Sequence, residues 1–179
     1  YIHLPDQTLV YDGAASQVLG EAVWFTLTTS LFVNGQYRAR DLVWCYDKWL
    51  VGDPTSSSHG YLSDTVSSHY GNLVGWEFGT LIVYNESNGA IFNELELVSL
   101  TGSVAIGTNP QISTSYSLDG KSWSQDRYIT VGTTGNTAKR LAWFQQGHMR
   151  NWRIQRFRGD SDAHVSFVRL EAQIEALVY

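Results

Sequence analysis

Short strand-sized runs, separated by glycine-containing turns roughly every 8–12 residues, are the feature that most constrains the fold of this chain. Sixteen glycines stand against three prolines, and the many aromatic residues between them favour pleated, half-buried surfaces. No helical pattern lies between the runs, so βαβ units are not indicated. No strict internal repeat is visible either. The spacing is typical of sandwiches, barrels and propellers, and predicts an all-β fold of antiparallel sheets.

Several segments predict where the strands turn. Asn34-Gly35 and Asn88-Gly89 are hairpin signals, because both residue types tolerate a positive φ. The second pair lies between two long strand candidates, 74–84 and 91–100. The tail 171–177 is predicted to be either a short helix or the end of the last strand.

The segment 101–110 is the preferred internal boundary, because it is rich in Gly, Thr and Asn and ends in Asn109-Pro110. We therefore expect one antiparallel β region over residues 1–105 and a second over residues 106–179. One continuous domain is the alternative.

The net charge of −5 hides an asymmetry between the two ends of the chain. Residues 1–120 hold 3 Lys or Arg against 12 Asp or Glu, whereas residues 121–179 hold 9 against 5. The two portions either face each other within an assembly or serve different partners. An acidic chain is a poor non-specific ligand for DNA, so we expect DNA contact to be indirect at most.

The sequence also indicates whether the chain crosses a membrane, whether it carries a signal peptide, and which residues are buried. No stretch approaches the roughly 18 apolar residues of a transmembrane helix, so we expect a soluble protein without a membrane partner. The opening Tyr1–Pro5 has neither an initiator Met nor a signal peptide, so we expect a piece of a longer chain. The single cysteine, Cys45, lies in an apolar run and is expected in the core. The run 22–27, apolar on both faces, is expected to be buried.

The sharpest local motif is an Asp-box, made by Ser117, Asp119, Gly120 and Trp123. Asp119 is expected to accept hydrogen bonds from the turn, Gly120 to allow its tight geometry, and Trp123 to pack beneath it. This motif stabilises a hairpin and performs no catalysis. A sialidase would also need an arginine cluster, a tyrosine nucleophile with its carboxylate, and an acid.

A second motif interleaves arginines with aromatic residues near the C-terminal end. In an extended strand Arg150, Trp152, Arg156 and Arg158 share one face, and Arg153 lies on the other. Such a composition is enriched at protein–protein interfaces, and two aspartates just after it also favour intramolecular ion pairs. Single-stranded nucleic acid is the less favoured partner. We predict these five residues as an interface.

No catalytic or metal-binding constellation stands out in the sequence. His59 and His69 lie near Asp53 and Asp64, but not at spacings typical of metal sites, so exposed polar residues are expected there. No phosphate-binding loop and no nucleophile elbow is present. The sequence therefore predicts a protein that is not an enzyme and has no cofactor.

Two groups of segments resemble the phage packaged-DNA stabilisation proteins. The N-terminal group resembles a propeller blade of that family, and the C-terminal group supports the resemblance over most of the chain. The segments are His3–Asp12, Trp44–Tyr46 and Leu50–Asp53, then Ser117–Gly120, Gly147–Arg153 and Val165–Leu170.

The resemblance implies the C-terminal part of the tail hub of a short-tailed phage, made in the host cytoplasm and located in the virion tail. It implies a propeller-blade-like N-terminal part and a β-sandwich-like C-terminal part. In that family the hub is a non-enzymatic structural protein that forms a six-fold ring below the portal adaptor. The hub closes the tail channel, retains packaged DNA, and contacts the tailspike and the tail needle.

Two other classes of function stay open at this point. The first is a carbohydrate-binding β module that uses exposed tryptophans. The second, less favoured, is a sialidase-like fragment suggested by the Asp-box alone.

Overall fold

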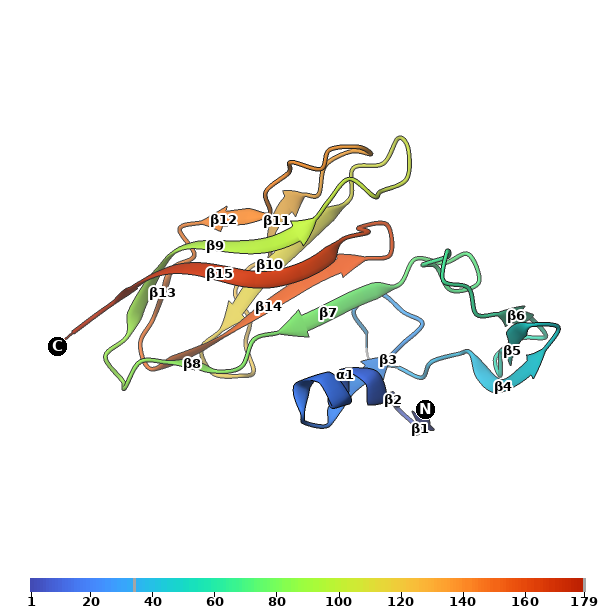
Figure 1. The fold of residues 1–179 in the computed structure, drawn as a ribbon. Helices are drawn as coiled ribbons and strands as arrows, with labels where there is room; N and C mark the ends of the chain where they lie inside the picture. The colour runs from blue at the N-terminus through green and yellow to red at the C-terminus, as the bar shows by residue number, and fades with distance from the viewer. Residues whose placement is uncertain (34, 179) are drawn as a thin grey trace. The chain divides into compact units, whose positions relative to one another are not determined.

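A computed structural model describes residues 1–33 and 35–178 and consists mainly of antiparallel strands (Figure 1). This confirms the predicted all-β fold class. Contacts divide the chain into two compact units, Tyr1–Val74 and Gly75–Tyr179. The predicted Asn34-Gly35 turn includes Asn34, which lies outside the described residues.

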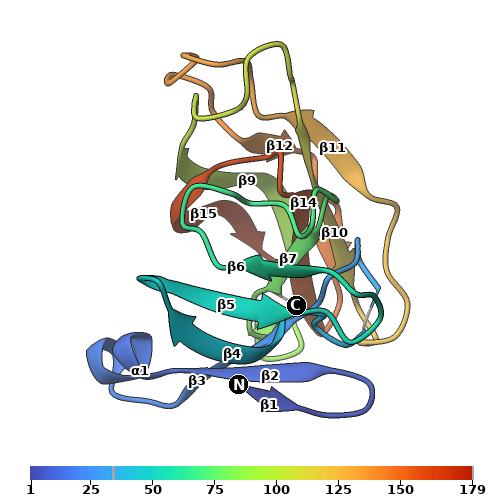
Figure 2. The same ribbon diagram turned by 90° about the vertical axis from the view of Figure 1, so that its right-hand side faces the viewer.

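The first unit contains two small antiparallel sheets and one short helix (Figure 2). The strand order of one sheet is β1-β2-β3 and that of the other is β4-β5-β6. The strands are β1 (Ile2–His3), β2 (Thr8–Asp12), β3 (Val23–Leu27), β4 (Arg40–Cys45), β5 (Lys48–Gly52) and β6 (His59–Tyr61).

Helix α1 (Gly13–Leu19) follows β2, although no helical pattern was predicted between the strand-sized runs. Asp12 caps the helix, because its Oδ1 accepts a hydrogen bond of 2.9 Å from the backbone N–H of Ala15. Gly20 ends it in the left-handed conformation at φ 74°. No helix among the described residues is long and apolar enough to cross a membrane.

Burial in the first unit is limited to a small cluster. Tyr37, Ala39 and Val51 form it, and Leu27 and Leu42 pack against it. The prediction that 22–27 is buried on both faces is wrong, because Trp24 and Phe25 are exposed. Cys45 is half-buried and not in the core. Both sheets have only three strands.

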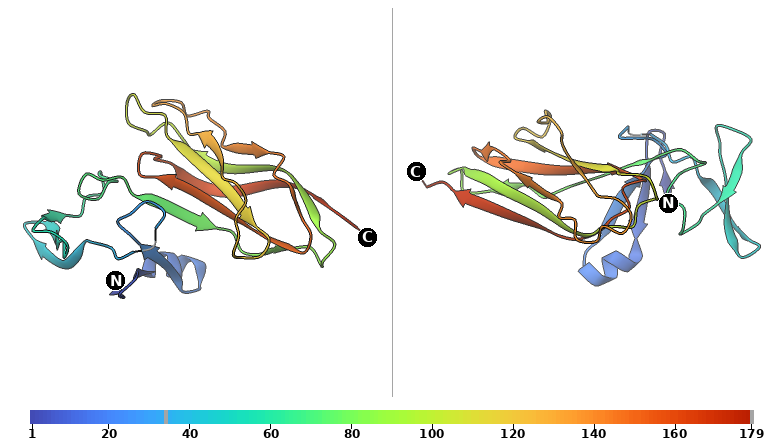
Figure 3. Two further views of the ribbon diagram at one scale, coloured as in Figure 1. Left: turned by 180° about the vertical axis from the view of Figure 1, so that it is seen from behind. Right: turned by 90° about the horizontal axis from the view of Figure 1, so that it is seen from above.

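The second unit is a sandwich of two antiparallel sheets (Figures 1 and 3). In one sheet the order is β11-β10-β14-β7, and β8 also pairs with β14. In the other, β9 is central, with β12 and β13 on one side and β15 on the other. The strands are β7 (Gly75–Gly79), β8 (Val83–Tyr84), β9 (Ala90–Leu100), β10 (Gln111–Ser117), β11 (Arg127–Thr130), β12 (Ala142–Phe144), β13 (His148–Met149), β14 (Trp152–Asp160) and β15 (Ser166–Ala176).

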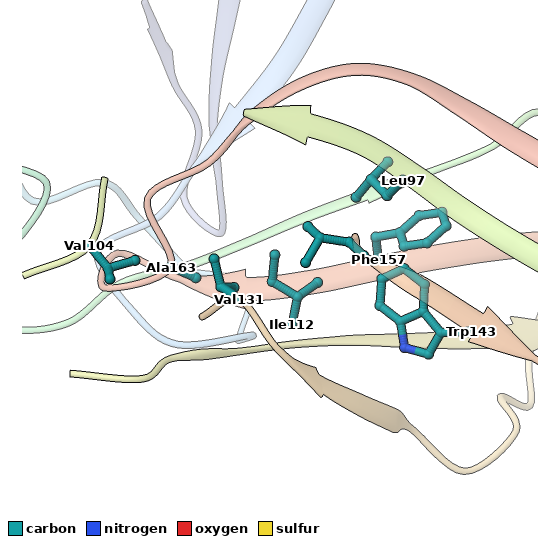
Figure 4. Packing of buried hydrophobic residues seen from close by; sticks show 8 residues of the cluster. Leu97, Val104, Ile112, Val131, Trp143, Phe157 and Ala163 are labelled. Carbon is teal, nitrogen blue, oxygen red and sulfur yellow. The ribbon is translucent and has the colours of Figure 1, made fainter. Parts of the chain in front are cut away.

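The sandwich core joins residues from both sheets (Figure 4). Phe157 on β14 and Trp143 on β12 lie with ring centroids 5.6 Å apart. On β9 the buried positions change parity, from Ala90 and Phe92 to Leu95 and Leu97. A register shift opposite Gln173 and Ile174 of β15 accounts for this, because one extra residue of β9 turns the following side chains to the other face.

The structure divides the chain earlier than the boundary proposed from composition, which separated 1–105 from 106–179. The segment 101–110 connects β9 to β10 inside the sandwich. Leu97, Val104 and Ile112 lie before, within and after this segment, and all three belong to one buried cluster. A polar connection between two packed sheets therefore has the composition expected of a linker.

Asn88-Gly89 makes a turn, but not a hairpin. It joins β8 to β9, which lie in different sheets and do not pair with each other. Gly89 has φ 78°, and a Cβ there would stand 2.8 Å from the carbonyl oxygen of Met149, so the site requires glycine. The C-terminal tail 171–177 ends the last strand and is not helical.

A substitution at Gly159 tests the packing between β7 and β14. This glycine lies directly opposite Trp76, whose indole N–H donates to the carbonyl of Asp160 at 3.1 Å. A Cβ on Gly159 would stand 2.6 Å from Cε2 of that indole. We expect Gly159→Ala to lower the free energy of unfolding by about 1–3 kcal/mol, because overpacking displaces the ring. Chemical denaturation measures this.

Gly79→Ala on the paired strand β7 is the matched control. Its Cβ would lie 3.4 Å from the carbonyl oxygen of Gln155, an ordinary contact, so we expect little change. Equal losses in the two variants would contradict the proposed clash.

Candidate functional site

The Asp-box forms the turn of the β10–β11 hairpin. Oδ1 of Asp119 accepts hydrogen bonds from the backbone N–H groups of Lys121 at 2.8 Å and Ser122 at 2.7 Å, and the Ser122 hydroxyl donates to Oδ2. The Ser117 hydroxyl accepts from the N–H of Gly120 at 2.9 Å. Gly120 has φ 71°, the left-handed conformation that favours glycine. The hydrogen bonds of Ser117 and Asp119 are therefore all made within the turn itself.

Arg153, in the middle of the arginine-rich strand, is completely buried. Its guanidinium lies between two rings, 4.2 Å from the centroid of Phe92 on β9 and 3.9 Å from that of Tyr116 on β10. Phe92 and Tyr116 thus form an aromatic cage that joins the two sheets around one cation.

Hydrogen bonds satisfy the same guanidinium. Nε and Nη2 donate to Oε1 of Gln155 at 3.0 and 2.7 Å, and Nη1 donates to the carbonyl of Gln146 at 2.7 Å. Gln155 in turn donates to the Thr114 hydroxyl, which donates to the carbonyl of Arg156. Burial lowers the pKa of Arg153 to about 10, which still leaves it charged at neutral pH.

Arg156 and Arg158 lie on the outer face of the same sheet. The guanidinium of Arg156 is 3.9 Å from the centroid of the Trp123 ring, and its Nε and Nη2 donate to the Ser115 hydroxyl. Arg158 donates to Glu77 at 2.6 Å. Both arginines also lie 3.9 Å from carboxylate oxygens of Asp126. These contacts are within the sandwich, so the two arginines already have intramolecular partners.

The two sequence motifs therefore pack against each other. The Asp-box tryptophan, Trp123, covers Arg156, and the Trp152 ring lies 3.7 Å from where a Cβ of Gly120 would be. Trp152 thus lies against the turn at Gly120, whereas Trp123 contacts Arg156. Of the five predicted interface residues, Arg150 is exposed, Trp152 and Arg158 are half-buried, and Arg153 and Arg156 are buried. Arg153 cannot reach a partner protein.

The histidines and aspartates of the first unit do not converge. Asp53 is buried and forms an ion pair with Arg38, which holds its pKa well below the usual range. His59 and Asp64 are exposed, whereas His69 packs against Tyr37 with ring centroids 5.2 Å apart. No three His, Cys, Asp or Glu side chains gather in the described part of the chain.

A cavity of about 380 Å³ in the first unit was not predicted from the sequence. Tyr37, Tyr61, His69 and Tyr70 contribute to its wall, together with several hydroxyl side chains. It holds none of the residues selected as an interface or an Asp-box.

One side of the sandwich leaves apolar residues of both sheets in solvent. β15 pairs with β9 alone among the described strands, so its outer edge is open. Phe167 contacts Trp76 and Phe78 of the facing sheet, which places β7 on this same side. We call this surface the open side. Its exposed residues are Leu81, Ile82, Phe167, Val168 and Ile174.

Two family comparisons match the two units. Residues 75–175 match the family described as bacteriophage P22 Gp10, β-sandwich, and residues 1–67 match that described as bacteriophage P22 Gp10, β-propeller. The tail hub protein gp10 of Salmonella phage P22 is similar to this chain, with 28% identical residues over an alignment of 149 residues. The matched region covers 83% of this chain and 30% of that protein.

Replacing Arg153 tests the aromatic cage. We expect Arg153→Ala to lower the free energy of unfolding by about 3–5 kcal/mol, because it opens a cavity and leaves Gln155 without its buried partner. Arg153→Lys keeps the charge but loses the pair of hydrogen bonds to Oε1 of Gln155. It should lower the free energy of unfolding by about 1–3 kcal/mol. Arg150→Ala, at an exposed position in the same run, should stay within about 0.5 kcal/mol. Small and equal effects of all three in urea denaturation would exclude the cage.

The Asp-box carboxylate predicts a pH dependence. Hydrogen bonds from the Ser122 hydroxyl and from the backbone N–H groups of Lys121 and Ser122 hold the pKa of Asp119 well below its ordinary value. Its contribution to stability is therefore present above the unfolded pKa of about 3.9, and is lost as the pH falls toward the folded pKa. Between about pH 4 and 2, Asp119→Asn should lose stability less steeply than the parent.

Denaturation series at several pH values measure these slopes. Asp162→Asn, at an exposed position between β14 and β15, is the control and should keep the parental slope. A parental slope in Asp119→Asn would rule out this role of the carboxylate.

Proposed function

The chain belongs to the family of the bacteriophage P22 Gp10 proteins, and from this membership we propose that it is a structural component of a phage tail hub. The similarity to the tail hub protein of phage P22 supports a location in the tail of the virion. The two matched families also support the predicted propeller-like and sandwich-like parts.

The open side of the sandwich is the observation that carries this proposal. By register, Ile174 on β15 lies opposite Phe92, which is buried, yet Ile174 is 44% exposed. In the connection from β7 to β8, Leu81 is 91% exposed. Apolar residues of both sheets thus meet solvent beside a long unpaired strand edge, and such a surface pairs readily with another chain. A subunit of an assembly needs a surface of this kind.

Copies of the chain are the first partner that we propose, arranged head to tail in a six-fold ring. In a ring, each contact joins two different surfaces. The opposite side of the sandwich ends in β11 and β12, where Tyr128 and Phe144 are 62% and 55% exposed. Exposed aromatic residues are enriched at interfaces, so these two residues suit the open side of the next copy.

The distribution of charge supports apolar contacts over ionic ones in such a ring. Arg140 pairs with Glu94 and Glu96, and Arg158 pairs with Glu77. The basic C-terminal portion therefore neutralises acidic residues of its own unit. In the proposed hub, a portal adaptor, a tailspike and a tail needle are the remaining partners, and channel closure retains the packaged DNA.

The sialidase-like alternative has no support in the arginine geometry. Arg153 faces the interior of the sandwich, whereas Arg156 and Arg158 lie on the outer face. These three side chains therefore form no common pocket. We propose a role that is structural and not enzymatic.

Phage particles test the proposal. Gold-labelled antibodies against this chain should mark the tail end of particles in electron micrographs. Particles assembled without the protein should fail to protect their DNA from nuclease. Labelling elsewhere on the particle would refute a tail location, and protected DNA without the protein would refute channel closure.

Substitution on the open side sharpens the same experiment. Ile174→Lys should reduce incorporation into particles about tenfold, because a charge would be buried in the apolar contact. Ile106→Lys, at a 90% exposed position between β9 and β10, is the control and should be incorporated normally. Thermal unfolding of both variants shows that the sandwich is intact. Equal incorporation would exclude the open side as the contact.

A further inference from the structure

The cavity in the first unit has aromatic walls held in place by their own contacts. His69 packs edge-on against Tyr37, with ring centroids 5.2 Å apart. The ring of Tyr70 has the Arg38 guanidinium 5.7 Å from its centroid, and Gly60 lies against its edge. Tyr61 carries the Lys48 ammonium 4.3 Å from its centroid. The rings are therefore positioned by contacts within the wall and by two cations outside the lining, Arg38 and Lys48.

The lining of this cavity combines rings and hydroxyl groups with aliphatic side chains, and carries no formal charge. Tyr37, Tyr61 and Tyr70 supply phenols, and Thr29, Ser63 and Ser68 supply alcohols. No Asp, Glu, Lys or Arg is among the lining residues. Burial lowers the pKa of His69, so its ring is neutral at physiological pH. A charged ligand would lose its hydration here without gaining a counter-charge.

Two residues of the wall each have a buried polar atom that is left unpaired. Nδ1 of His69 and the hydroxyl oxygen of Tyr70 are buried and have no hydrogen-bond partner among the described residues. Buried polar atoms are nearly always paired in folded proteins, so such exceptions call for an explanation. Tyr70 also has φ 49°, an uncommon conformation for a side chain of this size. Backbone strain of this kind clusters at binding sites.

We propose that this cavity binds a neutral, hydroxyl-rich ring compound, that is, a saccharide unit. Aromatic faces suit the C–H faces of a sugar ring, and alcohols and phenols both donate and accept hydrogen bonds to sugar hydroxyls. A volume of about 380 Å³ is within the range of small-molecule sites and suits a ligand of one or two rings.

This site differs from the surface of exposed tryptophans expected from composition. Trp24, Trp44 and Trp49 are exposed, but none of them lines the cavity. The site is also independent of the proposed hub function. The hub is tested in phage particles and this cavity in the isolated chain, so either proposal can fail alone.

Binding of methyl glycosides to the full 179-residue chain tests the proposal. The probes are the methyl glycosides of glucose, galactose, rhamnose and N-acetylglucosamine, followed by saturation-transfer NMR and by ¹H–¹⁵N spectra. At least one glycoside should receive saturation and shift the amide signals of His69, Tyr70 and Gly71. No transfer to any probe at millimolar concentration would overturn the proposal. Shifts confined to the exposed tryptophans would overturn it as well.

Tyr70→Phe is the matched variant, because it removes only the unpaired hydroxyl. The dissociation constant of the bound glycoside should rise about tenfold, as expected for one lost hydrogen bond in a buried site. Tyr128→Phe, on β11 of the other unit, should bind like the parent. Unchanged affinity in Tyr70→Phe would overturn the assignment of this hydroxyl to the site. Should this variant fail to fold, the map of amide shifts in the parent chain still decides between the cavity and the tryptophans.

Discussion

The sandwich depends on one buried cation without a buried carboxylate beside it. Removing a guanidinium from water is costly, and the cost is offset only where its nitrogens find acceptors and the charge finds a polarisable neighbour. Around Arg153 those neighbours come from β9, β10 and the connection between β12 and β13. The cation can be satisfied only after both sheets are in place. Its position therefore selects one register of β14 against the facing sheet.

The rest of the arginine-rich strand follows from that register. With Arg153, Gln155 and Phe157 directed inward, Arg156 and Arg158 must lie on the outer face. There the turn of the Asp-box folds over them, and Trp123 and Ser115 cover Arg156. The arginine-rich strand and the Asp-box, which from the sequence could each be a surface for a partner, thus pack within the sandwich. What remains for partners is the opposite kind of surface, apolar and at the edge of the sandwich.

The sequence predicted the class of fold and several local turns, because these depend on neighbouring residues. Strand periodicity, Gly120 and the Asp119 acceptor all act within a few positions. Helix α1 was not predicted, because an Asp-Gly pair such as Asp12-Gly13 is typical of a turn, although the same aspartate can also cap a helix. Only the following residues decide between the two. The composition of 101–110 could not show that Val104 packs with Leu97 and Ile112, because that contact depends on tertiary structure. The cavity was missed for the same reason, since Tyr37 and His69 meet across more than 30 positions of the chain.

The two units differ in where their aromatic residues lie: most rings of the sandwich core are buried, whereas several rings of the first unit are exposed. In the sandwich, Phe157 and Trp143 fill the space between sheets, and only the edges are left to contact another chain. In the first unit, Trp44 and Trp49 pair across strands but stay about half exposed, and the buried cluster is small. Blades of a propeller bury such faces against neighbouring blades, so the exposed rings suit packing between blades. Neither of these tryptophans lines the cavity, whose aromatic wall residues are Tyr37, Tyr61, His69 and Tyr70. Assembly and ligand binding would then use different residues, and neither would constrain the other.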